Sequence, residues 1–278
     1  MKTIRQWVGG EYYEGSPLGV VPVENPATGE VTAELLQASK EDLDHTVEVA
    51  RDAQKEWANY SLSKRVAIMF KMRQLVLDHQ DEMARLIVEE HGKNYSDAIG
   101  EIQRGRETFD FATAINVALK GEYSHDVSTG VDIHTTRQPV GVVAGICPFN
   151  FLAMVPMWMH PLAVATGNAF ILKPASPTPS ASLLTAELYK EAGLPDGVFN
   201  VLSGGPPQCS GHPGSPGYRR YFVCWFDASG SHCPRHRRKP WQARPGPRRC
   251  EQPRHCHARQ RSGLCCPAHL RIRFRSCW

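Results

Sequence analysis

Residues 138–175 constrain the fold of this chain more than any other segment. They contain two short apolar runs, residues 140–146 and 168–172, and an apolar helical segment beginning near Val155 lies between them. Each run has the pattern of a strand that is buried on both of its faces. Two such strands joined by a helix predict an α/β fold with a parallel sheet.

Polar side chains follow both predicted strands. The first strand should stop at Cys147 and Pro148, because proline lacks a backbone donor, and Asn150 then lies at a strand-to-helix corner. The second strand ends in Lys173 and Pro174. Ligands of open α/β sheets bind at the carboxyl ends of the strands. The sequence therefore predicts an amide and an ammonium group at a ligand-binding edge.

Residues 1 to about 204 contain several distinctive motifs: RQPVGVVAGI, PFNF, the Met-rich and Trp-rich helix with its AMVP and WM pattern, GNAFILKPA and EAGLPDGVFNVLSG. Together these motifs resemble the aldehyde dehydrogenase superfamily. The resemblance is strongest to the CoA-acylating branch, the methylmalonate-semialdehyde dehydrogenases. It implies the Rossmann-like NAD-binding domain of the aldehyde dehydrogenase fold, incomplete in this chain.

The resemblance also implies a chemistry. A thiolate adds to methylmalonate or malonate semialdehyde, hydride passes to NAD, and CoA takes the acyl group with loss of CO2, in valine and inositol catabolism. The implied partners are the small-molecule aldehyde and CoA, and members of the family form homodimers or homotetramers. Two alternatives stay open: another NAD(P)-dependent aldehyde dehydrogenase, or a non-catalytic fragment that binds dinucleotide and dimerises.

The resemblance also implies that Asn150 stabilises the transition state. Thiohemiacetal formation puts negative charge on the former carbonyl oxygen, where one fixed amide donor is worth about 3 kcal/mol. We expect Asn150 to be that donor, and the alternative is a turn-capping asparagine. The preceding residues should lie beside the cofactor: Ile146, Cys147, Pro148 and Phe149.

Cys147 is the one cysteine of residues 1–204, so it has to be weighed as the nucleophile. A reactive cysteine needs a lowered pKa and an approach path, and an apolar strand end supplies neither. The nucleophile of the family lies far downstream, in a segment absent from this chain. Cys147 is therefore predicted to have no catalytic role.

Lys173 is implied to bind the adenosine ribose hydroxyls of NAD. Ser176 and Pro177 stand where the family commonly has Glu and often Arg, which leaves the choice between NAD and NADP open. No GxGxxG fingerprint occurs in residues 1–204, as expected for the family's unusual way of binding dinucleotide. Leu152 and His160 are further departures, at positions where proline and an aromatic residue are expected.

The other elements of residues 1–204 are predicted as scaffold. Ser39 and Asp42 predict a capping box for a helix that ends near Asn59. A second helix is predicted from about residue 61 to 90, with Gly92 placed to end it. Later elements are a helix over residues 180–192 and a strand over residues 198–202.

Two segments between these elements are rich in polar residues. Asp97, Glu101 and Glu107 are predicted to form a solvated helix face with nearby arginines, rather than paired catalytic carboxylates. Residues 122–138 alternate around Ser-Thr-Gly and predict a hairpin, which the resemblance identifies as the oligomerisation hairpin. His125 and His134 of this region are predicted to be surface residues rather than metal ligands.

The average composition conceals two different parts. Residues 1–204 contain 17 basic and 26 acidic residues, a net charge of −9, whereas residues 205–278 contain 15 basic and two acidic residues, a net charge of +13. The second part also holds eight of the nine cysteines and has no helical or strand period. Two regions are therefore predicted, a folded one over 1–204 and an aberrant, disordered tail over 205–278.

The tail has the composition expected of translation in a wrong frame. Codons for GYRRYFVCWFD (residues 217–227), read one base later, permit DIAAISFVGST, an apolar strand followed by Gly-Ser. The same shift permits GKRVQALG from WQARPGPR and AIVMP from the segment Arg254 to Ala258, in family order and near family spacing. These matches predict a one-base insertion, or an equivalent shift, near Gly204.

Other interpretations of the tail are less consistent with the sequence. A zinc or nucleic-acid module would need ligand spacings such as CxxC or arginines on one helix face, and neither occurs. We therefore expect no metal site and no nucleic-acid partner. The amino terminus lacks the apolar core of a signal peptide, and no apolar run is long enough to cross a bilayer, so a cytoplasmic protein without membrane contact is expected.

Overall fold

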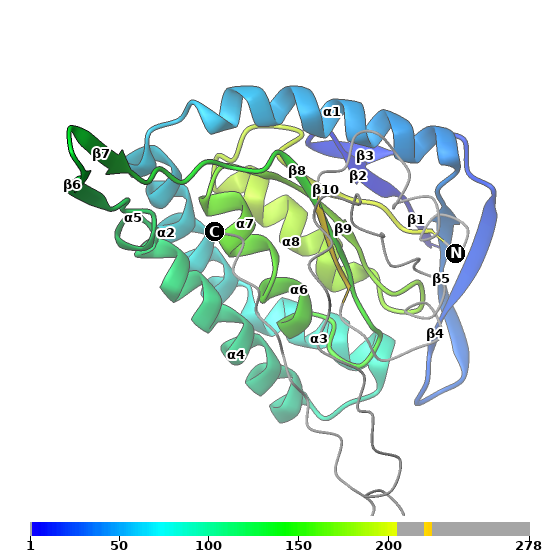
Figure 1. Ribbon diagram of the computed structural model, residues 1–278. Coiled ribbons are helices and arrows are strands. Elements are labelled where there is room, and N and C mark those ends of the chain that lie inside the picture. Colours follow the sequence, from blue (N-terminus) through cyan, green and yellow to red (C-terminus); the bar gives the residue numbers. More distant parts are fainter. Residues whose placement is uncertain (1, 205–219, 224–278) are drawn as a thin grey trace, which may run out of the picture. The chain divides into compact units, whose positions relative to one another are not determined.

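The computed structural model describes residues 2–204 in full and the backbone of residues 220–223 (Figure 1). The strands within these residues are β1 (Lys2–Ile4), β2 (Gln6–Val8), β3 (Glu11–Tyr13), β4 (Gly19–Asn25), β5 (Glu30–Gln37), β6 (Tyr123–Ser128), β7 (Val131–His134), β8 (Val142–Ile146), β9 (Ala169–Lys173), β10 (Phe199–Val201) and β11 (Arg220–Val223). The helices are α1 (Lys40–Ala58), α2 (Leu62–Asp78), α3 (Gln80–His91), α4 (Tyr95–Thr113), α5 (Ile115–Ala118), α6 (Met154–Met157), α7 (His160–Ala165) and α8 (Ser180–Glu191). The predicted α/β class is confirmed.

A six-stranded sheet with the order β11-β8-β9-β10-β2-β3 forms the centre of this part of the chain. The four strands from β11 to β10 are parallel to their neighbours, and β2 and β3 add an antiparallel edge. A smaller sheet has the order β1-β5-β4. The strands β8, β9 and β10 were all predicted from apolar runs, within two residues of their observed ends.

Alternate residues of β8 and β9 enter two different apolar layers. One layer joins the two strands to α1, which contacts β8, β9 and β10, and the other joins them to α7 and to the helices behind it. In β9, Ala169 and Ile171 belong to the α1 layer, while Phe170 and Leu172 belong to the other. Burial on both faces explains why these strands are continuously apolar rather than alternating.

Helix α1 has the capping box that the sequence predicted. The Ser39 hydroxyl accepts a hydrogen bond from the Asp42 amide at 3.1 Å, and the Asp42 carboxylate accepts one from the Ser39 amide at 2.8 Å. Near the other end of the helix, the buried Trp57 indole donates to the Val164 carbonyl at 2.9 Å. These contacts fix α1 against the turn that leads into β9.

The prediction of one helix over residues 61–90 was wrong. Two helices, α2 and α3, meet at His79, whose backbone leaves the helical region with φ −98° and ψ 15°. The His79 ring pairs with Glu82 in the first turn of α3 at 2.9 Å. The apolar periodicity continues through the break because both helices pack against the same core, so it gave no sign of the bend. Gly92 ends α3 with φ +76°, as predicted.

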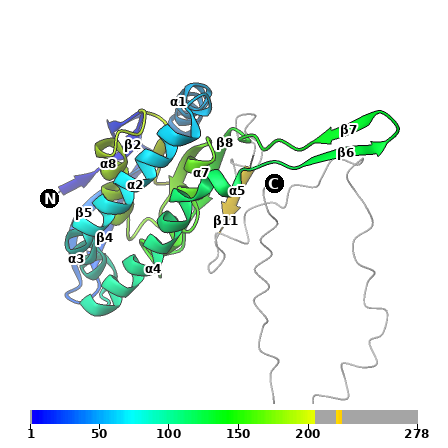
Figure 2. The ribbon, with the colours of Figure 1, turned by 90° about the vertical axis from the view of Figure 1, so that its left-hand side faces the viewer.

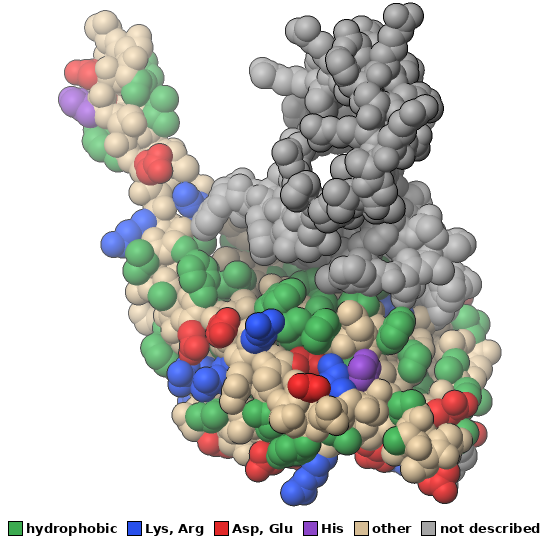
Figure 3. All heavy atoms as spheres, turned by 90° about the horizontal axis from the view of Figure 1, so that it is seen from below, with side chains coloured by type: hydrophobic (Ala, Val, Ile, Leu, Met, Phe, Trp, Pro, Cys, Tyr) green, Lys and Arg blue, Asp and Glu red, His purple; other side chains and the backbone are tan. Residues whose placement is uncertain are grey.

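The hairpin predicted over residues 122–138 is present as the paired strands β6 and β7 (Figure 2). Every residue of the two strands is exposed, including Tyr123, Val131 and Ile133. Elsewhere, charged side chains of both signs lie between apolar ones on the face shown in Figure 3. None of the helices in residues 2–204 combines the length and the apolar character that crossing a membrane requires.

His160 occupies the position where the resemblance predicted an aromatic residue. It is fully buried, and its ring makes edge contacts with Phe109, Phe170 and Phe199. Its Nδ1 atom forms a 2.7 Å hydrogen bond with the buried Tyr189 hydroxyl. Burial lowers the pKa of His160 to about 3, so the ring is neutral and replaces an aromatic side chain in this cluster.

This burial predicts a loss of stability in acid. The folded pKa of His160 lies below its unfolded value, so its stabilisation is complete above about pH 6.5 and falls as the pH drops towards 3. By pH 5 the loss should reach about 2 kcal/mol. The double variant His160→Phe with Tyr189→Phe removes the titrating ring without leaving the tyrosine hydroxyl unpaired.

Urea unfolding at pH 5 and pH 7.5 checks this prediction. The free energy of unfolding of the double variant should change less between the two pH values than that of the unaltered chain. An equal change in both chains would show that His160 does not contribute to the acid sensitivity.

Candidate active site

The carboxyl ends of β8 and β9 lie at the same level of the sheet. Ile146 pairs with Lys173 in the parallel register, and the Cys147 amide donates to the Lys173 carbonyl at 3.0 Å. The loops that follow the two strands therefore start side by side. Asn150 is on the first loop and Lys173 at the start of the second, as the sequence indicated.

The corner after β8 places its residues in contrasting environments. Cys147 and Pro148 are buried, Phe149 is 53% exposed, and Asn150 is half-buried. The Asn150 Oδ1 atom is inaccessible to solvent and has no hydrogen-bond partner among the described residues. A turn-capping asparagine would use this oxygen to accept a backbone N–H. Asn150 does not, which weighs against that alternative.

Glu101 corrects the prediction of a solvated helix face. Its side chain, on α4, is 1% exposed, and its Oε1 atom accepts hydrogen bonds from the amides of Ala153 at 2.7 Å and Met154 at 3.2 Å. These two amides begin the short helix α6, where first-turn N–H groups have no partner within the helix. The Glu101 carboxylate, which belongs to α4, therefore caps the amino terminus of α6.

Lys93 completes this arrangement and was not singled out in the sequence. Its ammonium group pairs with Glu101 Oε2, donates to the Asn150 carbonyl at 3.2 Å and lies 4.7 Å from the centre of the Phe151 ring. The sequence did contain a signal for the burial of Glu101, because Glu101 shares one face of α4 with Ala98, Ile102 and Gly105. A charged residue on an apolar helical stripe is expected to be buried and paired.

The loop after β9 begins at the Lys173 side chain. This side chain is half-buried, and its ammonium makes no hydrogen bond or ion pair with any residue that the structure describes. The following residues form a turn in which the Thr178 amide donates to the Ala175 carbonyl at 3.1 Å. Ser176 is half-buried and Pro177 is exposed, so the family's Glu and Arg positions are both accessible here.

A second buried carboxylate, Glu90 of α3, holds the end of this loop. It is 7% exposed, and its Oε2 atom accepts a hydrogen bond from the Ser180 amide at the start of α8, at 3.1 Å. Burial raises the pKa of Glu90 to about 7, although the hydrogen bonds from Ser180 oppose the rise. Among the described residues it has no ion-pair partner, in contrast to Glu101.

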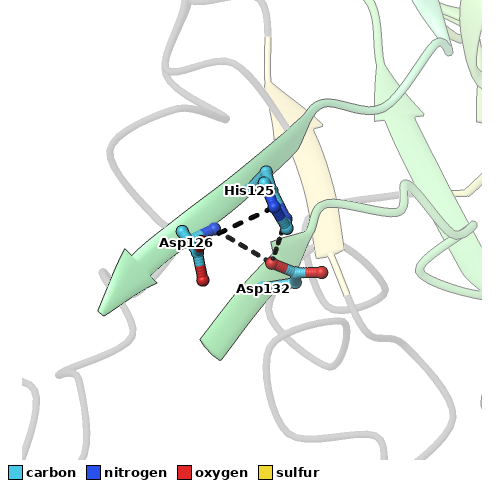
Figure 4. A group of neighbouring side chains, drawn as sticks. All are labelled: His125, Asp126 and Asp132. Atoms are coloured by element: carbon cyan, nitrogen blue, oxygen red, sulfur yellow. Dashed lines mark hydrogen bonds and ion pairs between the residues drawn. The ribbon is translucent and has the colours of Figure 1, made fainter. Parts of the chain in front are cut away.

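A group of exposed residues on the hairpin has the composition of a metal site: His125, Asp126 and Asp132 (Figure 4). Their atoms are engaged with one another, because Asp132 Oδ1 accepts from the Asp126 amide at 3.0 Å and lies 2.8 Å from His125 Nδ1. Asp126 has φ +48° where the strand register shifts. These bonds stabilise the bulge, and both His125 and His134 are exposed, as predicted.

Comparison with known proteins identifies the family. Residues 12–211 match the aldehyde dehydrogenase family, so the chain belongs to it. It is 45% identical over 204 residues to malonate-semialdehyde dehydrogenase 2 of Bacillus mycoides and 43% identical to malonate-semialdehyde dehydrogenase of Lacticaseibacillus casei. In each case the match covers 73% of this chain and 42% of the relative, so the chain spans less than half of their length.

Solved structures give the same result. A predicted methylmalonate-semialdehyde dehydrogenase from Sinorhizobium meliloti, crystallised with NAD, superimposes with a TM-score of 0.78 at 39% identity, over 80% of this chain and 45% of that protein. Methylmalonate-semialdehyde dehydrogenase from Oceanimonas doudoroffii superimposes with a TM-score of 0.74 at 39% identity, over 80% and 50% of the two chains. The aldehyde dehydrogenase fold of the described part is therefore confirmed.

The raised pKa of Glu90 predicts a pH-dependent stability. Since the folded pKa lies above the unfolded value of about 4.5, the contribution of Glu90 is complete below that pH and is lost as the pH rises to about 7. Glu90→Gln keeps an acceptor for Ser180 but cannot ionise. Relative to that of the unaltered chain, the free energy of unfolding of this variant should rise by about 3 kcal/mol between pH 4.5 and pH 8.

Urea unfolding at these two pH values measures the gain. Glu89→Gln is the matched control: Glu89 is the exposed neighbour of Glu90 on the same helix, and its charge is a minor cause of the raised pKa, so this variant should give a much smaller difference. If both variants responded alike to pH, the burial of Glu90 would not be the cause.

Proposed function

We propose that residues 1–204 are the dinucleotide-binding part of an NAD-dependent, CoA-acylating dehydrogenase of malonate or methylmalonate semialdehyde. One observation carries this proposal: an ammonium group and a carboxamide, neither engaged with the described residues, stand at the ends of two adjacent parallel strands. Ligands of α/β sheets bind at such ends. The likeness to semialdehyde dehydrogenases supports the substrate class.

The residues at this edge suit a dinucleotide. The Lys173 ammonium, which has no partner within residues 2–204, can donate to ribose hydroxyls, and Ser176 can add a weaker hydrogen bond beside it. Ile146, Cys147, Pro148 and Phe149 would present an apolar wall at the end of β8, of which Phe149 is the exposed member. NAD bound here would accept the hydride. With Ser176 and Pro177 in place of an acidic and a basic residue, NADP is the second candidate cofactor.

Asn150 would act on the substrate rather than on the cofactor. Addition of a thiolate to an aldehyde turns the carbonyl oxygen into an oxyanion, and the Asn150 Nδ2 group would donate a hydrogen bond to it. A donor that is already oriented lowers the barrier because it needs no reorganisation when the charge forms. This assigns Asn150 a role in the chemical step and Lys173 a role in binding.

Cys147 is not suited to be the attacking thiolate. Its side chain lies in the core at 6% exposure, at the end of a strand, where an aldehyde carbon has no path to the sulfur. The nucleophile must therefore come from a segment beyond residue 204. We propose that residues 205–278 are read in a shifted frame that begins near Gly204; except for the backbone of 220–223, they lie outside the described residues.

A second candidate function is a dinucleotide-binding and dimerising protein without catalysis. It is favoured by the exposed apolar side chains of the hairpin, Tyr123, Val127, Val131 and Ile133, which a second copy could cover in a dimer. In this case residues 122–138 would assemble the protein whether or not turnover occurs. Measuring both cofactor binding and turnover separates the two functions.

Cofactor binding tests the proposal directly. Titration of the 278-residue chain with NAD, followed by tryptophan fluorescence, should saturate, and Lys173→Ala should weaken binding about tenfold or more because a charge-assisted hydrogen bond is lost. Lys71→Ala removes an exposed lysine of α2 and is the matched control. Absence of saturation in the unaltered chain would refute the cofactor, and an unchanged Kd for Lys173→Ala would refute its role.

Turnover tests the catalytic assignment. The 278-residue chain should not reduce NAD with either semialdehyde and CoA, whereas a gene from which one base near Gly204 is removed should yield an active chain. In that chain, Asn150→Ala should lower kcat about a hundredfold or more and leave NAD affinity almost unchanged. Turnover by the 278-residue chain that Cys147→Ala abolishes would contradict both the predicted inactivity of this chain and the non-catalytic assignment of Cys147.

A further inference from the structure

We propose that Lys93 and Glu101 are positioning residues for Asn150, and that their ion pair fixes the corner from which the Asn150 carboxamide reaches the substrate. The inference rests on the proposed function, because it gives Asn150 the role of oxyanion donor. Neither residue touches the reacting atoms in this arrangement. Both act through the backbone of residues 150–154.

Three backbone atoms of this corner bind one ion pair. Glu101 Oε1 accepts from the Ala153 and Met154 amides, and Lys93 Nζ donates to the Asn150 carbonyl. The pair itself is removed from water, with the Glu101 side chain 1% and the Lys93 side chain 11% exposed. In such an environment hydrogen bonds to charged groups are stronger than in water, because solvent does not compete for them.

No hydrogen bond within the described residues orients the side chain of Asn150. Neither its oxygen nor its nitrogen forms a hydrogen bond within the described residues. The position of the carboxamide therefore depends on packing and on the backbone of the corner, which the ion pair holds at Asn150 and at Ala153. Since a misplacement of about 1 Å can cost a hundredfold in rate, such a donor requires a fixed backbone.

The surroundings favour Lys93 as the cation of this cluster. His91, the other basic group near Glu101, has a buried and unpartnered Nδ1 atom. Burial lowers the pKa of His91, and the charge of Lys93 lowers it further while Glu101 opposes the shift. Glu101 and Lys93 thus form a charged pair beside a neutral ring.

Isotope labelling isolates the two contacts in the full chain. Asn150–Phe151 is the only Asn-Phe step of the sequence, so a chain with 13C-carbonyl Asn and 15N Phe gives one backbone cross-peak, which reports the Asn150 carbonyl. Leu-Ala steps occur twice, at Leu152–Ala153 and Leu162–Ala163. A chain with 13C-carbonyl Leu and 15N Ala therefore reports the Ala153 amide, with Ala163 of α7 as an internal control.

The variants have distinct expected signatures. Lys93→Met should shift the Asn150 carbonyl signal and leave the Ala153 signal nearly in place. Glu101→Gln should move the Ala153 amide upfield, speed its hydrogen exchange about tenfold or more, and also shift the Asn150 signal. Glu107→Gln, at an exposed position of the same helix, should move neither signal.

The outcomes separate positioning from mere stability. If Lys93→Met or Glu101→Gln lowered the thermal midpoint while the Asn150 signal stayed unchanged, the pair would stabilise the fold without positioning Asn150, and the inference would be overturned. Should Glu101→Gln not fold, Lys93→Met alone decides, since it retains the cap on α6. The labelling result does not depend on NAD, so failure of the cofactor titration would overturn the proposed function only.

Discussion

The parallel pairing of β8 with β9 determines where every candidate site residue lies. Because Ile146 is level with Lys173, the residues that follow both strands leave the sheet together, and two loops distant in sequence form one edge. This pairing depends in turn on burial of both sheet faces, by α1 on one side and by α7 with its neighbours on the other. The site is therefore a consequence of how the two apolar layers fix the strands.

Loops at a sheet edge need anchors of their own, and here the anchors come from α3 and α4. Glu101 binds the loop after β8, and Glu90 binds the end of the loop after β9. Burying a carboxylate is costly, and removal of one partner from a buried ion pair typically costs 3–5 kcal/mol. Such a pair contributes little net stability compared with apolar packing. This agrees with the role proposed for Lys93 and Glu101, which is to fix one arrangement of the loop after β8.

The sequence was sufficient to predict the strands, the capping box of α1 and the edge that carries Asn150 and Lys173. These features depend on local patterns: apolar runs, a Ser with Asp three residues later, and polar residues directly after strands. It was not sufficient for the break at His79, since the core-facing pattern continues across the bend, nor for the burial of Glu101. That burial depends on α4 packing against α6, some fifty residues away in the chain, and a charge-rich segment conceals it.

The two anchoring carboxylates differ in one respect that bears on function. Glu101 has Lys93 beside it, whereas Glu90 has no ion-pair partner among the described residues, and burial raises its pKa to about 7 against the opposing hydrogen bonds from Ser180 and the weaker effect of Lys2. A change of pH near neutrality therefore alters the charge at the anchor of the loop after β9. If that loop serves the cofactor, a pH change in this range should act on cofactor binding through the Ser180 contact of Glu90.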